Sequence, residues 1–269
     1  MAIITISRGS YSMGKEVAEK VARRLGYQCI AREVLLEASK EFNIPEIKMV
    51  QAVNDAPSIL ERITYGKERY ISCFRAALLK HLQSDNVVYH GLAGHFFLKG
   101  ISHMLKVRII ADIDDRVRLE MARDGVSEKE ALAKIKRNDE ARRKWGLHLY
   151  GMDTSDASLY DVVIHIRKIT VDAAADIICH TAGLEAFRTT SQSQKTMDDL
   201  VVAAQVKASL VGLKPDVQVF SKNGHVMVGT KTIPVKEGPL LEQMKAIAEE
   251  VQGVKSVEVK VSYLVDWPD

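Results

Sequence analysis

The sequence predicts an α/β fold, with a parallel sheet in the first two thirds of the chain and a small α+β unit at its end. Up to residue 183, short apolar strands alternate with amphipathic helical segments, the pattern of a parallel sheet covered on both faces. A glycine-containing loop joins the first strand to the first helix. After a polar segment the pattern changes, and an Asn-Gly pair predicts a hairpin between two strands.

Five short apolar segments are expected to be the strands of the parallel sheet. They are Ile3–Ser7, Tyr27–Ile30, Val87–His90, Val107–Ala111 and Asp161–Ile166. Helical periodicity predicts the helices Lys15–Leu25, Glu61–Gln83, Arg116–Arg123, Glu128–Trp145 and Val171–Ala182, the last with Gly183 as its C-cap.

The chain divides in composition near residues 185–196, which are rich in Ser, Thr and Gln and lack apolar periodicity. This segment is expected to be a linker. Beyond it, helices are predicted at Met197–Leu210 and Leu240–Val251, and strands at Val217–Phe220, Val226–Gly229 and Val254–Val261. The expected organisation is a domain at residues 1–184, a linker at 185–196 and an αββαβ unit at 197–269.

Composition excludes several classes of function. The 269 residues carry a formal net charge of only +3, so the protein is not expected to bind nucleic acid electrostatically. Cys29, Cys73 and Cys179 form no CxxC pair, which argues against a disulfide framework or a zinc site. The sequence shows neither a signal peptide nor an apolar run of roughly 18 residues, so a cytoplasmic protein is expected.

The loop after the first strand has the pattern of a phosphate-binding loop. Gly9-Ser-Tyr-Ser-Met-Gly14-Lys15 matches the first seven positions of G-x-x-x-x-G-K-[ST] and leads directly into a helix. Glycines let successive backbone N–H groups converge on phosphate oxygens, and the helix N-terminus and a lysine add positive charge. The residues expected to bind a nucleotide are Gly9, Ser10, Ser12, Met13, Gly14, Lys15 and Glu16.

Glu16 stands where a Ser or Thr hydroxyl normally ligates magnesium. A carboxylate can bind magnesium, which makes Glu16 the candidate metal ligand, with the ion carried by the nucleotide. It also repels phosphate, so the alternative is a first-turn helix residue that points away. The alternative for the whole loop is a plain strand-to-helix turn with a lysine in solvent.

A basic segment follows the fourth strand. Ser127 and Glu130 form a capping-box pattern at the start of a helix. The cationic residues of this helix are Lys134, Lys136, Arg137, Arg142, Arg143 and Lys144, interrupted by Asp139. Such side chains on a mobile helical hairpin can close over polyphosphate and stabilise a transferring phosphoryl group. The alternative is a solvated basic helix face.

Together these features resemble the cytidylate kinase-like family over about residues 1–183. The resemblance rests on Ile4–Gly9 with Gly14–Glu16, Ala31–Leu35, Ile135–Arg142, and Gly151–Asp153 leading to Tyr160–Val163. It implies a five-stranded parallel core of the P-loop nucleoside monophosphate kinase type, ATP at the loop, and a monophosphate acceptor between loop and lid. In this family a Glu after the basic residue of the loop is common.

The resemblance also implies roles for single residues. Lys15 would hold the β- and γ-phosphates, Arg142 would reach the transferring phosphoryl group, and Asp139 would orient the lid arginines. Arg32 is the candidate for the acceptor phosphate, and Arg137 and Arg143 are further candidates for binding the acceptor. His90, at the end of a strand, could also approach a ligand, and the alternative is a hydrogen-bonded structural histidine.

One segment departs from the family. After the third strand, cytidylate kinases resemble Asp-Gly-Arg-Asp, whereas this chain reads His90-Gly91-Leu92-Ala93, and the usual Asp near the second strand is Ala31. Each lost charge in a closed site is expected to cost a few kcal/mol of discrimination. Either the acceptor differs from CMP or transfer has been lost.

The C-terminal unit resembles a BON domain. The resemblance rests on Asp198–Leu210, Val217–Val219, Asn223–Gly229 and Val251–Val259. It implies a small module that binds a ligand, a lipid or a surface, and the alternative is an oligomerisation or regulatory module.

Three functions are consistent with these patterns. The first is ATP- and Mg²⁺-dependent phosphoryl transfer to a nucleoside monophosphate or a related small phosphate acceptor. The second is a catalytically weak or inactive nucleotide sensor that regulates the BON-like unit. The third is a scaffold that nucleotide only stabilises.

Overall fold

The computed structural model describes residues 2–31, 33–42, 66–91, 94–230 and 237–261. Their central feature is a five-stranded parallel sheet in the order β2-β3-β1-β4-β5. Its strands are β1 (Ile3–Arg8), β2 (Gln28–Ile30), β3 (Val87–His90), β4 (Met104–Ala111) and β5 (Val162–Ile166). The register pairs Ile3 with Val87 of β3 and Ser7 with Arg108 of β4. The predicted five-stranded parallel core is confirmed.

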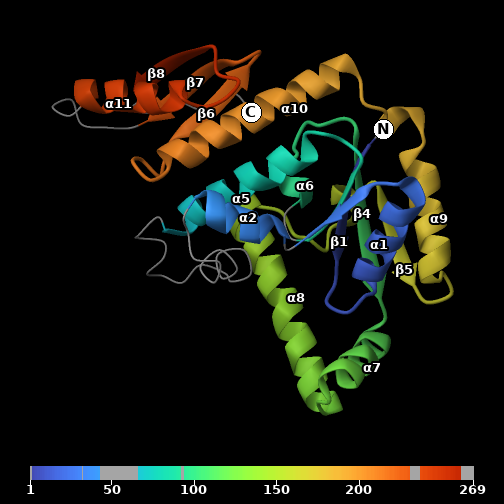
Figure 1. Cartoon of the computed structure of the whole chain (residues 1–269). Helices are drawn as coiled ribbons and strands as arrows, with labels where there is room; N and C mark the ends of the chain where they lie inside the picture. Colours follow the sequence, from blue (N-terminus) through green and yellow to red (C-terminus); the bar gives the residue numbers. More distant parts are fainter. Residues whose placement is uncertain (1, 32, 43–65, 92–93, 231–236, 262–269) are drawn as a thin grey trace.

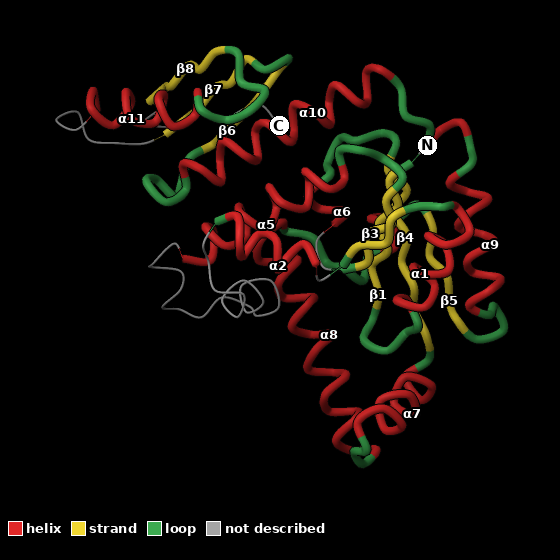
Figure 2. Tube along the Cα trace, viewed as in Figure 1, coloured by secondary structure: helices red, strands yellow, loops and turns green. Residues whose placement is uncertain are grey.

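Helices cover both faces of this sheet (Figures 1 and 2). On one face α1 (Gly14–Leu25) and α9 (Val171–Ala182) pack over Ile4 and Ile6 of β1. On the other face lie α2 (Glu33–Glu41), α5 (Gly66–Leu82) and α6 (Gly94–Phe97). Both faces of the sheet are covered by helices, so side chains on both faces of the central strands are buried away from water. These strands are therefore nearly continuous apolar runs rather than alternating ones.

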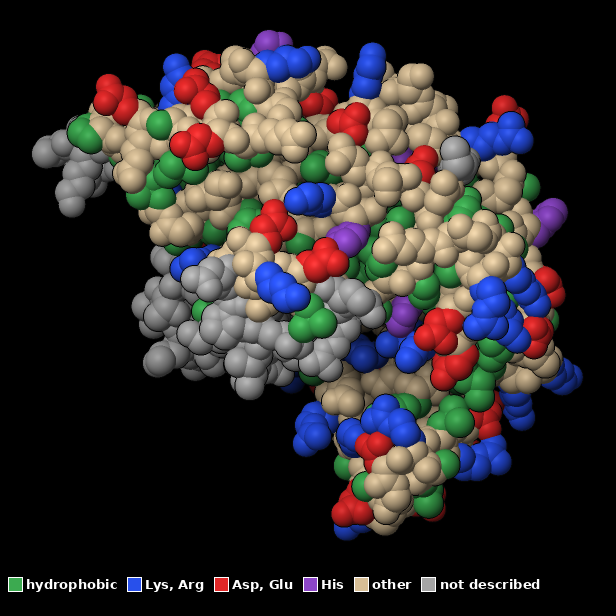
Figure 3. Space-filling model, in the orientation of Figure 1, with side chains coloured by type: hydrophobic (Ala, Val, Ile, Leu, Met, Phe, Trp, Pro, Cys, Tyr) green, Lys and Arg blue, Asp and Glu red, His purple; other side chains and the backbone are tan. Residues whose placement is uncertain are grey.

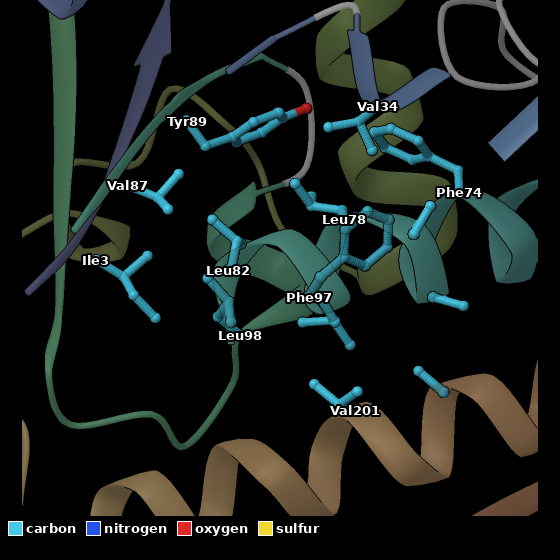
Figure 4. Close-up of a cluster of buried hydrophobic side chains, with 14 of the residues drawn as sticks. Ile3, Val34, Phe74, Leu78, Leu82, Val87, Tyr89, Phe97, Leu98 and Val201 are labelled. Atoms are coloured by element: carbon cyan, nitrogen blue, oxygen red, sulfur yellow. The ribbon is translucent and has the colours of Figure 1, made fainter. Parts of the chain in front are cut away.

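The second of these cores extends beyond the sheet (Figure 4). Phe74 and Leu78 of α5 pack with Phe97, whose ring meets that of Phe74 edge to face with 5.9 Å between the centroids. Val201 closes this core from a helix of the C-terminal third of the chain. This core therefore includes side chains from beyond the predicted linker.

A helical hairpin projects from the sheet at the bottom of Figure 1. It consists of α7 (Ile113–Asp124) and α8 (Glu128–Tyr150). The predicted capping box is present at Ser127 and Glu130. A small apolar cluster of Val117, Ala131 and Ile135 holds the two helices together.

The C-terminal unit is a three-stranded mixed sheet in the order β6-β7-β8, with β6 and β7 antiparallel and β7 and β8 parallel. Its elements are α10 (Ser191–Leu210), β6 (Gln218–Lys222), β7 (His225–Thr230), α11 (Glu237–Glu249) and β8 (Ser256–Val261), in the predicted αββαβ order. The Asn-Gly hairpin is confirmed, because Asn223 and Gly224 both have positive φ, at 52° and 81°.

The expectation of an irregular linker through residue 196 is wrong in part. A single turn of 3₁₀ helix at Glu185–Phe187 is followed by α10, which begins at Ser191. Thr190 and Ser193 form a capping box at its start. Ser, Thr and Gln in this segment cap and solvate the first turns of a helix, which composition alone does not distinguish from a linker.

Helix α10 belongs to two cores at once. Met197, Val201, Ala204 and Ala208 pack into the core of the first sheet, whereas Val206 and Leu210 pack under the small sheet. Successive faces of one 20-residue helix thus serve both units. The division of the chain into domains stays a prediction, and any boundary has to account for this sharing. Among the described residues, no helix is long and apolar enough to cross a membrane.

Candidate phosphate-binding site

The glycine-bounded loop lies at the carboxyl end of the central strand β1, where ligands bind in open α/β sheets. Backbone N–H of Gly9 donates to the carbonyl of Ile109 in β4 at 3.3 Å. The hydroxyl of Ser12 donates to the carbonyls of Gly9 and Ile109, at 3.0 and 3.1 Å. This hydroxyl therefore fixes the loop against β4, and any contact of Ser12 with phosphate would come through its backbone.

Two non-glycine residues of the loop adopt the left-handed backbone conformation. Tyr11 has φ of 58° and Met13 has φ of 59°. Such residues cost about 1–2 kcal/mol each and persist where the surroundings hold them. Alternation of right- and left-handed residues turns successive N–H groups toward one side, which is the geometry of an anion-binding nest.

Gly14 is required by the packing beneath the loop. A Cβ at this position would lie 2.7 Å from Cβ of Arg8 and 2.9 Å from its Cδ. The glycine therefore lets the first turn of α1 sit directly over the aliphatic stem of Arg8. The hydroxyl of Ser10 is buried here and, among the described residues, has no hydrogen-bond partner.

Lys15 and Glu16 occupy the first turn of α1 and are both exposed. The Lys15 ammonium has Glu19 at 3.6 Å, one turn further along the helix. An exposed i,i+4 pair of this kind contributes only about 0.3–0.5 kcal/mol, so it does not prevent Lys15 from turning to a phosphate.

Asp139 of the hairpin reaches the loop. One carboxylate oxygen accepts the backbone N–H of Ser10 at 3.1 Å, and the other is paired with the guanidinium of Arg116. Nε of Arg116 in turn donates to the carbonyl of Ser10 at 2.6 Å. Asp139 thus orients an arginine, as the family resemblance implies, but that arginine comes from α7. Arg116 was not among the predicted site residues, because nothing in its local pattern separates it from an ordinary exposed helix position.

Arg142 lies beneath the loop, where its guanidinium donates to the carbonyl of Arg8 at 3.1 Å. Burial lowers the pKa of Arg142, and the neighbouring charge of Arg8 lowers it further. Burial is also the main cause that lowers the pKa of Arg8. Arg8 and Arg142 are both half-buried, and two guanidinium groups close together favour an anion between them and the loop. Figure 3 shows Lys and Arg side chains gathered where the hairpin meets the body of the protein.

Tyr11 connects the loop with the hairpin. Its ring packs with the apolar cluster between α7 and α8, and Arg123 lies over it with Cζ 4.7 Å from the ring centroid. Burial raises the pKa of the Tyr11 phenol, and its hydrogen bond with Glu120 raises it further. Glu120 is itself fully buried and paired with Lys134 at 2.5 Å. The loop and the lid are therefore one packed unit.

The predicted acceptor residues are less well brought together. Arg143 pairs with Glu140 at 2.9 Å and Asp153 at 3.4 Å, within the hairpin and the segment after it. Arg137 is exposed on α8. His90 is buried at the end of β3. Arg32, Leu92 and Ala93 lie outside the described residues.

A polar cluster that the sequence analysis missed lies beside the loop. Arg108 donates to the hydroxyl of Tyr160 at 3.1 Å, and this hydroxyl lies 3.3 Å from Oγ of Ser7. The ring of His95 lies 5.1 Å from that of Tyr160, centroid to centroid. Burial lowers the pKa of His95 to about 4, helped by the charge of Arg108. The available signal was a cationic residue within a buried parallel strand, since Arg108 lies between Val107 and Ile109.

The described residues offer few ligands for a magnesium ion at this site. Within the ranges that the structure describes, no group of three or more His, Cys, Asp and Glu side chains is placed to hold a metal ion. Glu16 is exposed at the start of α1 and remains the candidate ligand. These residues suit a magnesium ion held chiefly by nucleotide phosphates, as is usual for this ion.

The sheet order, the loop at the end of the central strand and the helical hairpin beyond it define an α/β protein of the P-loop kinase type. The chain belongs to the cytidylate kinase-like family, whose family model matches residues 3–168.

Known relatives agree with this assignment. A cytidylate kinase from Thermococcus kodakarensis is 36% identical over 177 residues, which cover 65% of this chain and 85% of the relative. A cytidylate kinase from Sulfolobus acidocaldarius is 27% identical over 176 residues, or 65% of this chain and 91% of the relative. Among solved structures, an uncharacterized protein from Eubacterium ventriosum matches with a TM-score of 0.50 and 24% identity, over 68% of this chain and 98% of that one. This last similarity supports the fold alone.

Proposed function

We propose that this protein transfers a phosphoryl group from ATP to a nucleoside monophosphate, of the CMP kind, or to a related small phosphate acceptor. The observation that carries the proposal is the convergence of Arg8, Arg142 and the strained loop at the end of β1. Half-buried cationic groups and convergent N–H groups suit a polyphosphate better than any neutral ligand. The family and its named cytidylate kinases support the same reaction.

The residues of the loop fit a nucleotide triphosphate. The orphaned hydroxyl of Ser10 and the nest formed around Tyr11 and Met13 offer donors, and Lys15 is free to turn toward the β- and γ-phosphates. Arg142 would stabilise charge on the transferring group, with Asp139 and Arg116 holding the hairpin in register with the loop. Magnesium would neutralise the β- and γ-phosphates, with Glu16 as its nearest protein oxygen.

For the acceptor, we place its phosphate on the side of Ser7, Arg108 and Tyr160. His90, Arg137, Arg143 and Arg32 stay candidates from the sequence, of which Arg32 lies outside the described residues. The guanidinium of Arg108 can hold an anion without losing its bond to Tyr160. His95 is neutral at pH 7 and suits contact with an uncharged base or sugar edge.

The experiment is ADP release from ATP and Mg²⁺ against a panel of CMP, dCMP, UMP, AMP and GMP. Lys15→Ala is expected to lower kcat/KM by about 100-fold or more, because it removes a charge at the transferring phosphates. Lys99→Ala is the matched control, since Lys99 is an exposed lysine away from the loop. Absence of turnover on every acceptor, with ATP still bound in a Lys15-dependent manner, would contradict the kinase proposal.

That outcome would favour the second candidate function, a nucleotide sensor acting on the C-terminal unit. The observation behind it is helix α10, whose two faces belong to the cores of both units. Movement of α5 on nucleotide binding would then reach the small sheet through one rigid helix. Nucleotide-dependent protection of α10 amides from hydrogen exchange, without turnover, would support the sensor. The BON-like character of this unit stays part of that proposal.

A further inference from the structure

A second cavity, of about 690 Å³, lies away from the phosphate loop. Its walls come from the ends of α2 and α5, from α10 between Lys195 and Gln205, from the β6–β7 turn and from the segment before β8. Sites for small molecules usually have 300–1,000 Å³ and often lie between structural units. Figure 1 shows α10 running between the small sheet and the helices of the first sheet, which is where these walls meet.

The carboxylates of this cavity are already used by the protein. Asp199 accepts the hydroxyl of Ser221 at 3.0 Å and the backbone N–H groups of Asn223 and Gly224, at 2.9 and 3.2 Å. Asp198 accepts the side-chain amides of Gln83 and Gln194, at 2.8 and 3.1 Å. The bonds of Asp199 use both of its oxygens and fix the β6–β7 hairpin on α10, whereas those of Asp198 use Oδ1 and join α10 to the segment after α5. The third carboxylate of the lining, Glu41, is paired with Lys80.

Two of the three lysines of the cavity have no ion-pair partner among the described residues. Lys80, Lys195 and Lys255 line it from α5, α10 and the segment before β8. Lys80 has Glu41 at 3.7 Å, whereas neither Lys195 nor Lys255 has an ion-pair partner within the described part of the chain. The stem of Lys255 packs on Gly224, with Cγ 3.1 Å from the place of a Cβ there. The aliphatic stem of Lys255 is thus held against the β6–β7 turn, and the residue is exposed to solvent.

The uncharged lining is mixed. Its apolar part is Val201, Val202 and Val251, its polar part is the side-chain amides of Gln83, Gln205, Asn223 and Gln252, and none of the described lining residues is aromatic. An aromatic base would find no stacking partner here, whereas an aliphatic group would bury apolar surface. We propose that this cavity binds a phosphate-bearing small molecule with an aliphatic remainder, its phosphate held by the lysines of the walls. The site is distinct from the proposed kinase site and does not depend on it.

The test uses the full chain with Lys15→Ala, which weakens anion binding at the loop. Calorimetry with n-butyl phosphate is expected to show binding, several-fold tighter than that of inorganic phosphate. Adding Lys195→Ala and Lys255→Ala is expected to weaken it at least tenfold, whereas Lys222→Ala, on the exposed side of β6, leaves it unchanged.

Because the two lysines are exposed and make no ion pair among the described residues, their variants are expected to fold, which circular dichroism verifies. Equal affinity with and without the two substitutions would overturn the proposal. So would the absence of any binding in the Lys15→Ala chain, since the anion would then belong to the phosphate loop alone.

Discussion

The ring of Tyr11, in the phosphate loop, lies against the guanidinium of Arg123, in the lid hairpin, with Arg123 Cζ 4.7 Å from the ring centroid. Tyr11 holds this position with a φ of 58°, which a glycine would adopt without strain. Tyr11 thus occupies a position whose backbone conformation favours glycine. Its side chain contributes the contact between the loop and the lid hairpin.

This relationship predicts an unusual order of stabilities. Tyr11→Ala loses the ring packing but keeps a strained φ, and is expected to lower the free energy of unfolding by about 1–3 kcal/mol. Tyr11→Gly loses the same packing but relieves the strain, so it is expected to be about 1 kcal/mol more stable than Tyr11→Ala. Urea unfolding followed by circular dichroism measures both. A glycine variant less stable than the alanine variant would mean that φ is not positive at this position.

A side chain at Gly91, directly after β3, is predicted to clash with a buried residue. A Cβ there would lie 2.4 Å from the hydroxyl of Tyr89, which is fully buried, so neither group can move away cheaply. Gly91→Ala is expected to lower the free energy of unfolding by about 1–3 kcal/mol. Gly212→Ala is the control, because no atom lies within 4 Å of its added Cβ, and it should change stability by less than about 0.5 kcal/mol. Equal effects of the two substitutions in thermal unfolding would argue against the contact with Tyr89.

His95 predicts a loss of stability in mild acid. Burial lowers its pKa to about 4, below the value of about 6.5 expected in the unfolded chain. The unfolded chain therefore binds the proton more tightly, so the contribution of this group is complete above pH 6.5 and is lost as the pH falls from 6.5 to 4. The loss is at most about 3 kcal/mol.

The measurement compares urea unfolding of the wild type and His95→Asn at pH 7.5, 5.5 and 4.5. His103 also has a pKa lowered by burial, so only the difference between the two proteins isolates His95. The wild type is expected to lose more stability than the variant over this range. Parallel pH profiles would show that His95 is not buried in the neutral form.

The sequence predicted most of this fold because its signals are local. The loop after β1, the capping box at Ser127 and the Asn223-Gly224 turn each follow from a few neighbouring residues. Arg116 and Arg108 could not be recognised in this way, because their roles arise from contacts with Ser10 and Tyr160, which are distant in the chain. Helix α10 shows the same limit, since its polar first turns are typical of a linker and its apolar positions serve two different cores.

The sharing of α10 predicts where the chain can be shortened. A chain of residues 1–184 lacks Met197, Val201, Ala204 and Ala208, which cover the core between the five-stranded sheet and α5, and is expected to expose that core and bind hydrophobic dyes. A chain of residues 1–213 keeps the whole of α10 and is expected to unfold cooperatively in urea. In the full chain, Met197→Ala is expected to lower the free energy of unfolding by about 2–5 kcal/mol, because Met197 is fully buried, whereas Gln192→Ala, at an exposed position of the same helix, should have little effect. If residues 1–184 fold as stably as residues 1–213, α10 belongs to the small sheet alone, and the core between the five-stranded sheet and α5 closes without it.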